Sequence, residues 1–388
     1  MDKHILCLNS GSSSIKFALY RLGTGEELVV KGAIERIGMA GSWLWVKDNS
    51  GRRIAERIQE FPSHSAAVKA ILQNIMEENH LPSPDGVGHR VVHGGPAHTA
   101  HEVVTLELIF DLRQHISFAP LHLPAEILGI DAVTGQYPGL GQVACFDTAF
   151  HRSIPEIARC LPIVRTLWHE GVCRYGFHGL SYEYIVMALG DAARGRIIVA
   201  HLGNGASMTA LHDGVSLDTT MGFTPTGGLM MGTRSGDLDP GILIYLMEEK
   251  GYDANQFNKL LNHRSGLIGV SGISSDMKTL LEQRDSEPHA AQAIDMYCYH
   301  ARKAIGALSA TLGGLDGLVF TGGIGERADT VRAMICQGLD YLGIRLDPAQ
   351  NARHARIISP GGAPCTVRVI PTNEDMVIAR HTRRLLFG

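Results

Sequence analysis

Residues 5–20 read ILCLNSGSSSIKFALY, two apolar runs joined by a short polar segment of serine and glycine. This pattern predicts a β-hairpin. Residues 197–212 read IIVAHLGNGASMTALH and have the same plan, with four identities in sixteen positions when Ile197 is aligned with Ile5. The two stretches lie almost half of the 388-residue chain apart. We interpret them as a duplicated strand–glycine loop–strand unit, although four identities could also arise by chance.

Outside these hairpins, strands and helices are predicted to alternate. Apolar runs predict strands near 28–36, 43–48, 86–92, 142–146, 317–321 and 366–370. Helical periodicity predicts helices near 63–79, 105–117, 124–135, 253–262, 276–283, 287–312 and 328–339. Two further helices are expected, one after Asp239-Pro240 and one at the C-terminus. This alternation predicts an α/β protein.

The composition excludes several classes of protein. Hydrophobic residues make up 45% and charged residues 19%, which is typical of a globular chain and excludes a disordered one. The length suggests two or three domains. The net charge of −4 gives no reason to expect a nucleic-acid or membrane partner. Glycine is in excess, at 45 residues or about 12% against roughly 7% in average proteins, which suggests backbone placed close to ligands.

The seven cysteines are scattered, odd in number and form no CxxC pair. This pattern argues against a disulfide framework or a zinc site and favours a reducing cytoplasm. No apolar run reaches the 18 residues that a membrane-spanning helix needs. The N-terminus becomes polar too soon for a signal peptide.

Both hairpin loops are candidates for phosphate binding. In the first, Asn9 to Lys16, small serines such as Ser12 and Ser14 let backbone amides approach an anion, and Lys16 adds a positive charge. The alternative is a polar hairpin with a solvated lysine. The second loop, residues 201–207, contains Asn-Gly, which is also the commonest signal for an ordinary hairpin turn.

A third glycine segment follows the predicted strand 317–321. Gly323, Gly325 and Ala328 match the dinucleotide fingerprint on paper, but the acid expected about 20 residues later has no counterpart near 343–349. We therefore interpret the segment as a turn that lets a nucleotide lie against backbone. No GxxxxGK[ST] motif occurs, which excludes a P-loop enzyme.

Several charged residues stand beside glycines or strand ends. Arg90 and Arg234 are flanked by glycine-containing segments and suit a phosphoryl or carboxylate group, although a single such arginine is more often structural. Asp147 follows a predicted buried strand, where α/β proteins place site residues, or it caps a helix. Glu374 begins the last helix as a capping acid or as a Mg²⁺ ligand. His178 is the favoured histidine because glycines flank it.

Together these residues belong to segments that resemble the acetate kinases, within the wider group of short-chain carboxylate kinases. The segments occur in family order and span nearly the whole chain: NSGSSSIKF (9–17), GHRVVHGG (88–95), APLHLP (119–124), FDTAFH (146–151), YGFHGLS (175–181), HLGNGAS (201–207), MGFTP (221–225), MGTRSGDLDP (231–240), SGLIGVSG (265–272), FTGGIGE (320–326) and PTNED (371–375). Each segment alone is weak evidence, and the set is very specific.

The resemblance implies the fold shared by sugar kinases, actin and heat-shock chaperones, with two ribonuclease H-like domains flanking a cleft. We expect the first domain to comprise 1–150 plus a last helix 377–388, and the second to comprise 151–376. The resemblance also implies a homodimer and Mg²⁺-dependent transfer of a phosphoryl group from ATP to acetate, which gives ADP and acetyl phosphate. Mn²⁺ is an expected substitute metal.

Site residues carried over from the resemblance fall into four groups. The catalytic group is Asp147, His178 and Arg234. The substrate group is Arg90, Val92, Leu121, His122, Phe177 and Pro225. The ATP group is Ser12, Ser14, Lys16, His201, Leu202, Gly203, Asn204, Gly205, Asp276, Met277, Lys278, Gly323, Ile324, Gly325, Glu326 and Arg327. The metal group is Asn9 and Glu374.

The chain departs from the family pattern near the expected adenosine site and near Arg234. Arg327 stands where relatives commonly have asparagine, Lys278 where they often have arginine, and residues 226–228 read Thr-Gly-Gly in place of Leu-Glu-Gly. Nucleotide and acid preference are therefore left open. A propionate kinase is the nearest alternative, with a nucleotide-driven switch on the actin fold and an NAD enzyme as more distant ones.

Overall fold

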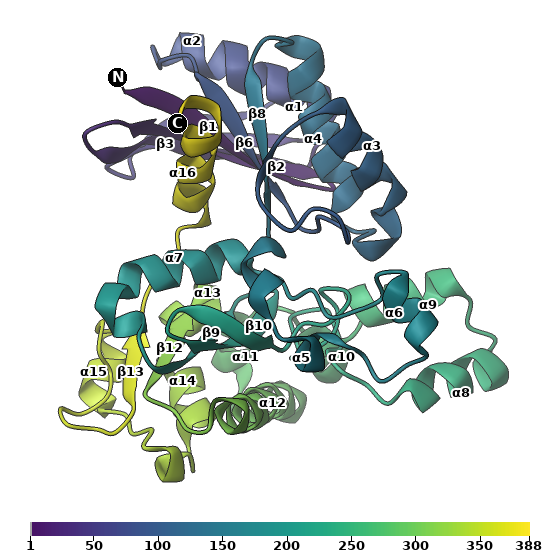
Figure 1. Cartoon of the computed structure of the whole chain (residues 1–388), viewed down its shortest axis with the longest axis vertical. Helices are drawn as coiled ribbons and strands as arrows, with labels where there is room; N and C mark the ends of the chain where they lie inside the picture. Colours follow the sequence, from purple (N-terminus) through teal and green to yellow (C-terminus); the bar gives the residue numbers. More distant parts are fainter. Residues whose placement is uncertain (1) are drawn as a thin grey trace. The chain divides into compact units, whose positions relative to one another are not determined.

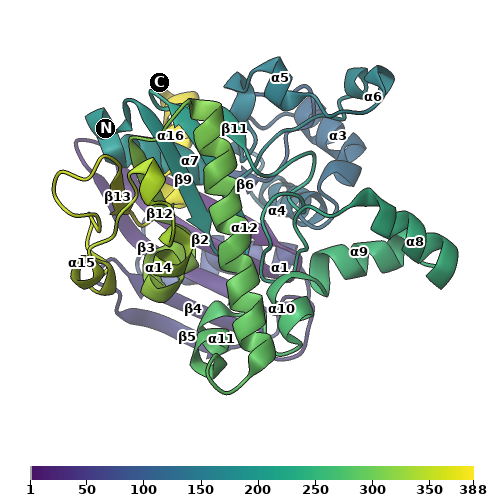
Figure 2. The same ribbon diagram turned by 90° about the horizontal axis from the view of Figure 1, so that it is seen from below.

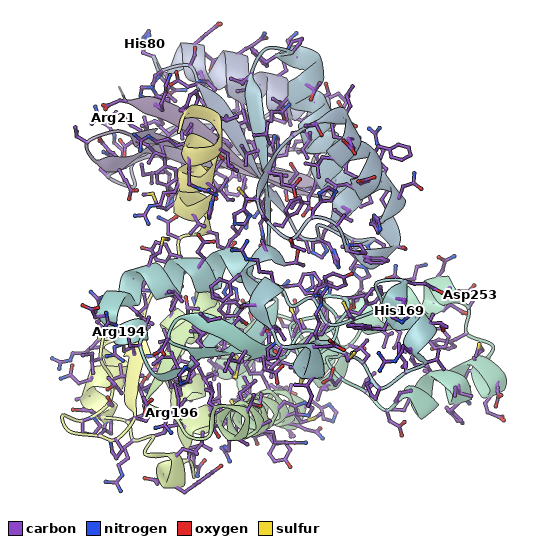
Figure 3. All side chains as sticks on the ribbon, in the orientation of Figure 1. Arg21, His80, His169, Arg194, Arg196 and Asp253 are labelled. Atoms are coloured by element: carbon purple, nitrogen blue, oxygen red, sulfur yellow. The ribbon has the colours of Figure 1, made fainter. Side chains whose placement is uncertain are left out.

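The structure is a computed structural model that describes residues 2–388 (Figure 1). The chain forms two compact units of mixed α/β structure. One contains the residues up to Phe150 together with Asn373–Gly388, and the other is His151–Thr372. Charged side chains such as Arg21 and Arg194 extend into solvent (Figure 3).

The first unit is built on an eight-stranded sheet with the order β5-β4-β3-β2-β1-β6-β8-β7. Its strands are β1 (Lys3–Gly11), β2 (Ser14–Leu22), β3 (Glu26–Glu35), β4 (Trp43–Asp48), β5 (Arg53–Ile58), β6 (Gly86–Val91), β7 (Glu102–Val103) and β8 (Gly141–Phe146). Strands β1 to β5 form an antiparallel meander, and β6 and β8 run parallel to β1. The predicted hairpin at 5–20 is therefore confirmed.

The helices of the first unit are α1 (His64–Lys69), α2 (Met76–Glu78), α3 (Leu106–Gln114), α4 (Leu123–Gln136) and α16 (Glu374–Phe387). A π-helical turn at Ala70–Ile75 joins α1 to α2, so the helix expected near 63–79 is confirmed as one continuous helical segment. It begins at Ser63, whose Oγ accepts a hydrogen bond from the amide of Ala66.

Successive side chains of β1 and β6 point to opposite faces of this sheet. Leu6, Leu8 and Val87 pack into the apolar cluster that includes Val133 of α4. Helix α16 covers the other face (Figure 1). A Cβ at Gly88 would lie 2.3 Å from Thr382 Oγ1 on this helix. A side chain at Gly88 would therefore push α16 off the sheet.

The second unit has a five-stranded sheet with the order β11-β10-β9-β12-β13. Its strands are β9 (Arg196–Leu202), β10 (Ala206–His212), β11 (Val215–Thr219), β12 (Gly317–Thr321) and β13 (Thr366–Val369). Its helices are α5 (Glu156–Arg159), α6 (Arg165–His169), α7 (Gly179–Leu189), α8 (Pro240–Lys250), α9 (Ala254–His263), α10 (Gly266–Ser271), α11 (Met277–Gln283), α12 (Pro288–Leu312), α13 (Gly322–Arg327), α14 (Asp329–Cys336) and α15 (Pro348–Ala352). The long α12 packs against β9, β10 and β11 (Figure 2).

The two sheets share one topology. The order β3-β2-β1-β6-β8 in the first unit corresponds to β11-β10-β9-β12-β13 in the second, with the same strand directions at every step. This repeat supports the duplication suggested by the sequence and is consistent with two domains of the actin and sugar kinase type.

The hairpins differ by one residue at their turns. Four residues separate the paired Ser10 and Ile15, whereas three separate the paired Leu202 and Ala206. Sequence identities before the turn therefore occupy equivalent positions, but Ala18/Ala210 and Leu19/Leu211 are displaced by one residue. Because side chains alternate along a strand, these two identities do not share a face, and the duplication rests on topology rather than on them.

The glycine segment after β12 departs from the prediction. It was expected to be a turn before a helix at 328–339, but Gly322–Arg327 is itself the helix α13, and α14 follows at Asp329–Cys336. Glu326 Oε1 accepts the amide of Gly322 at the start of α13, and the buried Arg332 donates to the carbonyls of Gly325 and Glu326 near its end. These tertiary contacts overcome the low helix propensity of glycine.

Within residues 2–388, we find no helix with the length and apolar character needed to cross a membrane.

Candidate functional site

In the first unit, Arg90 and Asp147 meet where two parallel strands end. Arg90 is the penultimate residue of β6, and Asp147 directly follows the neighbouring β8. Arg90 Nη2 donates to Asp147 Oδ2 at 2.7 Å, and Nε lies 3.2 and 3.1 Å from the two carboxylate oxygens. The Asp147 side chain is 1% exposed and that of Arg90 is 19% exposed. Asp147 therefore holds the guanidinium in a fixed direction.

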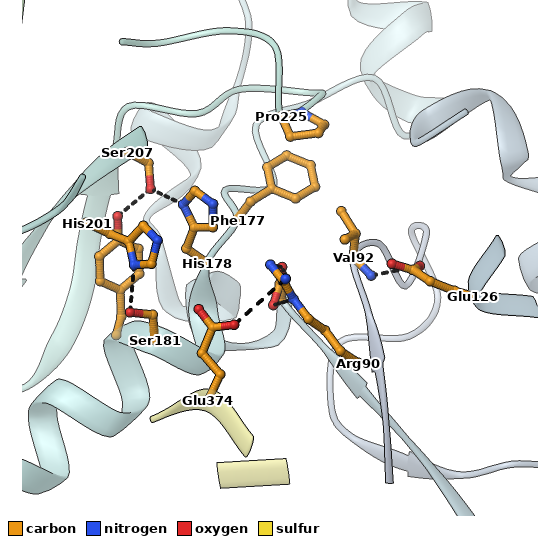
Figure 4. Close-up of polar contacts among 12 residues, drawn as sticks. Arg90, Val92, Glu126, Phe177, His178, Ser181, His201, Ser207, Pro225 and Glu374 are labelled. Carbon is orange, nitrogen blue, oxygen red and sulfur yellow. Dashed lines mark hydrogen bonds and ion pairs between the residues drawn. The ribbon is translucent and has the colours of Figure 1, made fainter. Parts of the chain in front are cut away.

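Glu374 approaches the same arginine from the first turn of α16. Its Oε2 lies 3.8 Å from Arg90 Nη1 (Figure 4). The N-cap of α16 is Asn373, whose Oδ1 accepts from the amide of Met376 and from the hydroxyl of Tyr20. Because Asn373 provides the cap, the carboxylate of Glu374 is directed to Arg90.

The electrostatics of this group follow from burial and proximity. Burial alone would lower the pKa of Arg90, but the Asp147 and Glu374 carboxylates raise it above its usual range. Burial and the charge of Glu374 raise the pKa of Asp375 to about 6, an effect that Arg90 and Lys16 partly oppose. Arg90 thus stays cationic at any physiological pH.

Val92, two residues after Arg90, is anchored by a buried acid. Its backbone amide donates to Glu126 Oε2 on α4 at 3.0 Å (Figure 4). The Val92 side chain is buried, whereas Leu121 and His122, which precede α4, are partly buried. The structure thus places Arg90, Val92, Leu121 and His122 in the first unit.

The hairpin β1–β2 turns tightly at Ser12-Ser13, with Asn9 paired to Lys16 across the two strands. Ser14 begins β2 and Lys16 is exposed. Strand β1 also contacts the start of α16, since Cys7 Sγ donates to the carbonyl of Asp375 at 3.1 Å.

In the second unit, two histidines stack beside the β9–β10 loop. The rings of His178 and His201 lie 4.3 Å apart at an angle of 23°. His178 Nδ1 shares a hydrogen bond of 2.8 Å with Ser207 Oγ, and His201 Nδ1 shares one of 2.8 Å with Ser181 Oγ (Figure 4). Tyr182 also bonds Ser207. His178 has a φ of +61°, a conformation that few non-glycine residues adopt.

Gly205 brings His178 and Arg234 together. A Cβ on Gly205 would lie 3.3 Å from His178 Nε2 and 3.6 Å from Arg234 Nη1. Arg234 Nη1 also donates to the carbonyl of Pro225 at 3.2 Å. Both Phe177 and Pro225 are buried. The bare backbone at Gly205 therefore leaves an imidazole nitrogen and a guanidinium facing the same small space.

A cavity of about 490 Å³ in the second unit gathers most of the expected adenosine residues. It is lined by Gly203, Asn204, Ser275, Asp276, Met277, Lys278, Leu281, Gly323, Ile324, Arg327, Ala328 and Asp329. Its volume is that of a pocket for a drug-sized ligand. The residues that line the cavity come mainly from the β9–β10 loop, the start of α11 and the helix α13.

Five residues of the second unit that were expected to contact ATP lie outside the lining of this cavity: His201, Leu202, Gly205, Gly325 and Glu326. Leu202 and Gly325 are buried. The Glu326 carboxylate accepts the amides of Gly322 and Thr372, at 3.1 and 3.2 Å. Its observed contacts hold α13 to the segment after β13.

The departure at residues 226–228 lies at the base of the loop that carries Arg234. Gly228 has a φ of +88°, and a Cβ there would come within 2.6 Å of the Thr220 carbonyl. Its amide donates to Asp237 Oδ1 at 2.7 Å, which closes the loop around Arg234. Thr226 Oγ1 donates to Asn262 Oδ1 at 2.6 Å.

Comparison with known proteins gives one consistent result. The family model described as the acetokinase family matches residues 4–380. The chain belongs to the acetokinase family. An acetate kinase of Rhodopseudomonas palustris is 46% identical over the full length of both chains, and one of Heliobacterium modesticaldum is 43% identical over 99% of this chain and 100% of its own.

Solved structures of this family have the same fold. The crystal structure of Porphyromonas gingivalis acetate kinase superposes with a TM-score of 0.90 at 38% identity, covering 99% of this chain and 100% of its own. That of a propionate kinase from Francisella tularensis gives 0.93 at 35% identity with the same coverage. The expected α/β fold of an acetokinase is therefore confirmed. The two solved structures are named for different acids, acetate and propionate.

Sequence reasoning missed the residues that hold the acetokinase side chains in place. Ser181 and Ser207 lie inside the segments YGFHGLS and HLGNGAS, yet only the fold shows that they bond the two histidines. Glu126 was detectable as a lone acid in the apolar segment LPAEILGI, at 123–130. Asp375 was noted beside Glu374 in the segment PTNED, but it was assigned no role.

Proposed function

We propose that this acetokinase is an acetate kinase, which transfers the γ-phosphoryl group of ATP to acetate in one direct, reversible step. The observation that carries the proposal is the Arg90 guanidinium, held by Asp147 and Glu374 in a chain of this family. A carboxylate is already a nucleophile at neutral pH, so the protein needs to neutralise and align two anions rather than supply a base.

Arg90 binds the carboxylate substrate. Its Nε and Nη2 face Asp147, and its Nη1 lies towards Glu374 at a longer distance of 3.8 Å. The substrate competes with Glu374 for the more weakly held side of the guanidinium. Val92, Leu121, Phe177 and Pro225 are the apolar groups proposed to contact the acyl methyl. His122 is proposed as a further substrate contact.

His178 and Arg234 stabilise the phosphoryl group as it is transferred. Ser207 fixes the imidazole from the Nδ1 side, which leaves Nε2 facing Gly205, where Arg234 also points. Two preorganised donors beside a bare backbone suit an anion whose charge is spread over several oxygens.

The nucleotide binds in the 490 Å³ cavity. We propose that Asp276, Met277, Lys278, Gly323, Ile324 and Arg327 surround the adenosine, while Gly203, Asn204, Gly205, Ser12, Ser14 and Lys16 contact the phosphates. His201 is proposed to act through its stacking on His178. The contacts of Leu202, Gly325 and Glu326 support a role in shaping the loops rather than in touching the nucleotide.

A magnesium ion fits the residues expected to hold it. Glu374 offers a carboxylate and Asn9 an amide oxygen, and Mg²⁺ is commonly bound by one or two carboxylates plus phosphate oxygens. When bound, the ion would neutralise phosphate charge. Mn²⁺ prefers similar oxygen donors and is proposed as a substitute.

Acetate is the acid that we propose is preferred. Val92 is buried and β-branched, and its backbone amide is held by Glu126, so we expect its side chain to leave less room for a longer acid than alanine would. One extra methylene is worth about 1–3 kcal/mol of discrimination. A propionate kinase remains the second candidate, because the superposition on such an enzyme is as good as that on acetate kinases.

We also propose a cytoplasmic homodimer. The cysteines of residues 2–388 are all free thiols, which supports a reducing compartment. Ile242, Ile244, Tyr245 and Met247 of α8 are 42–55% exposed, and large exposed hydrophobic side chains on one helix favour a protein partner. Light scattering of the purified protein tests the dimer, and a monomer at micromolar concentration would contradict it.

The activity is tested by trapping acetyl phosphate as acetyl hydroxamate with hydroxylamine, in the presence of ATP and Mg²⁺. We expect kcat/KM for acetate to exceed that for propionate by roughly tenfold or more. A preference for propionate would replace acetate by the second candidate. Failure to phosphorylate any short-chain carboxylate would refute the proposed function.

Two variants complete this test. Arg234→Gln should lower kcat by at least a hundredfold, in line with the loss of one transition-state donor. The matched control is Arg194→Gln, since Arg194 is 81% exposed and pairs only with the surface residue Asp191 among its described contacts. A near-normal kcat for Arg234→Gln would reject its catalytic role.

A further inference from the structure

Glu126 is a buried acid beside the proposed carboxylate site. It lies on α4 with 2% of its surface exposed, and its Oε2 accepts the backbone amide of Val92 at 3.0 Å. Val92 is two residues beyond Arg90 on the same segment (Figure 4). The hydrogen bond from the Val92 amide to Glu126 therefore fixes the backbone next to Arg90.

The charged groups that act on Glu126 come from two elements. Arg90 on β6 attracts its carboxylate, and Asp147 after β8 repels it. Titratable groups on other elements packed against α4 are engaged elsewhere: His64 of α1 bonds the carbonyl of Gly11, and Arg113 of α3 pairs with Asp131.

Two more titratable residues lie beside α4. His89 on β6 bonds Gln142 on the neighbouring β8, and burial lowers its pKa to about 4, so it is neutral at physiological pH. His122 precedes α4 by one turn from Glu126, and its carbonyl accepts the amide of Glu126. Arg90 and Asp147 are therefore the charged groups that act on Glu126, beside the larger effect of its burial.

The state of Glu126 changes the charge balance around Arg90. Burial raises the pKa of Glu126 to about 8, and the amide of Val92 and the charge of Arg90 only partly oppose this rise. At pH 7 the carboxyl is protonated, and Arg90 faces two carboxylates, Asp147 and Glu374. Above pH 8 a third carboxylate forms nearby in a poorly solvated region, where charges interact strongly.

We infer that Glu126 is a positioning residue that holds the Val92 backbone, and that its loss of a proton weakens the binding of the carboxylate substrate at Arg90. A third negative charge competes with the substrate for the guanidinium and repels the incoming anion. The inference rests on the proposed role of Arg90 in binding the carboxylate. Glu126 itself touches neither substrate nor nucleotide in this scheme.

The test compares the KM for acetate and kcat of the wild-type protein, Glu126→Gln and Glu126→Leu between pH 6 and pH 9.5. Glutamine keeps a carbonyl oxygen for the Val92 amide but cannot ionise, whereas leucine removes the acceptor. ADP release is followed at each pH with the coupling enzymes in excess. Glu77→Gln is the matched control, because Glu77 is an exposed acid on α2 of the same unit.

For the wild type and Glu77→Gln, we expect the KM for acetate to rise at least tenfold between pH 7 and pH 9.5, with a midpoint near pH 8 and kcat changed less than twofold. Glu126→Gln should have a low KM throughout this range. Glu126→Leu should raise the KM at every pH, because the buried Val92 amide loses its partner. If Glu126 were only structural, Glu126→Gln would not abolish the rise of KM near pH 8.

A wild-type KM that does not change with pH, or a Glu126→Gln variant that keeps the wild-type profile, would overturn the inference. Calorimetric titration of acetate into the same proteins at pH 7 and pH 9 gives a second measurement that needs no turnover. Tight acetate binding at pH 7 that weakens at pH 9 only with Glu126 present would sustain the inference even in a protein without kinase activity. In that case the missing kinase activity would refute the proposed function, and the pH-dependent binding would still support the role of Glu126.

Discussion

Replacing Asp147 with asparagine tests whether this residue orients Arg90. The substitution removes a buried charge but keeps one oxygen that can accept from the guanidinium. In the structure, Asp147 receives three of the close contacts of Arg90, at 2.7, 3.1 and 3.2 Å, and Glu374 is the next carboxylate, at 3.8 Å. We expect the guanidinium to turn towards Glu374, away from the direction that binds substrate.

The magnitude follows from the charges. Two opposite charges about 4 Å apart attract by about 4 kcal/mol at the effective dielectric constant of a protein site. Removing one partner of a buried pair costs about 3–5 kcal/mol. The retained amide oxygen and Glu374 compensate in part, so we take about 3 kcal/mol for Asp147→Asn. If this energy is what orients Arg90, kcat/KM for acetate should fall by roughly a hundredfold.

The assay pairs kinetics with unfolding. ADP release gives kcat/KM, and tryptophan fluorescence in urea follows both units, because Trp43 and Trp45 lie in the first and Trp168 lies in the second. The control is Asp316→Asn, which breaks a similar arginine–aspartate pair with Arg196, at 2.6 Å but with 36% and 44% of the side chains exposed. Exposed pairs contribute less than about 1 kcal/mol, so this variant should keep wild-type kinetics.

Asp147→Asn with kcat/KM within threefold of wild type, in a protein that unfolds at the wild-type urea concentration, would refute the reasoning. A large fall in unfolding free energy with unchanged kinetics would show that Asp147 stabilises the fold without orienting Arg90. The acid limb of the pH–rate profile separates a third case. If Asp147 were a general base, that limb would disappear in the asparagine variant.

Three further predictions follow from other contacts. In the folded protein the pKa of Glu126 is raised from 4.5 to about 8, so stability falls as pH rises through this window. Glu126→Gln should therefore gain about 1.4 kcal/mol per pH unit over wild type between pH 5 and pH 8, measured by urea unfolding. A constant difference would contradict this. Gly205→Ala should lower kcat tenfold or more by crowding His178, whereas Gly361→Ala, which has open space, should not. Equal kcat values for these two variants would count against the role of the loop. Arg327→Asn removes a cation from the 490 Å³ cavity and should raise the KM for ATP by about twofold to tenfold. An unchanged KM for both ATP and GTP would place the nucleotide elsewhere.

Much of the first unit could be anticipated because local patterns and topology agree there. Arg90 was expected to matter from the glycine segment beside it, and Asp147 from its place after a predicted strand. The carboxyl ends of parallel neighbours meet at one sheet edge. The hairpin at 5–20 was evident from its apolar runs and serine turn. The hairpin depends on residues close together in the sequence. The pairing of Arg90 with Asp147 spans 57 residues, but it follows from the general rule for neighbouring parallel strands.

Other features depend on contacts between distant segments. The helix at Gly322–Arg327 forms against the propensity of its glycines because Glu326 and Arg332 satisfy its ends. The partnership of His178 with Ser207 spans 29 residues and needs the fold to bring them together. The turn of the second hairpin is one residue shorter, and an ungapped alignment hides this difference. It aligns Ala18 with Ala210 and Leu19 with Leu211, although these pairs do not occupy equivalent positions in the two hairpins.

The packing of α16 on Gly88 has a consequence for how the protein is made. The first unit takes the layer formed by α16, and with it Glu374, from residues that follow the whole second unit in the sequence. During synthesis, β1 to β8 leave the ribosome long before α16, so the sheet face beside Gly88 stays uncovered while the whole second unit is translated. A chain that stops before residue 374 lacks a neighbour of Arg90. The site on the first unit thus waits for residues that are made only after the whole second unit, and a chain that stops before them should leave the sheet face beside Gly88 uncovered.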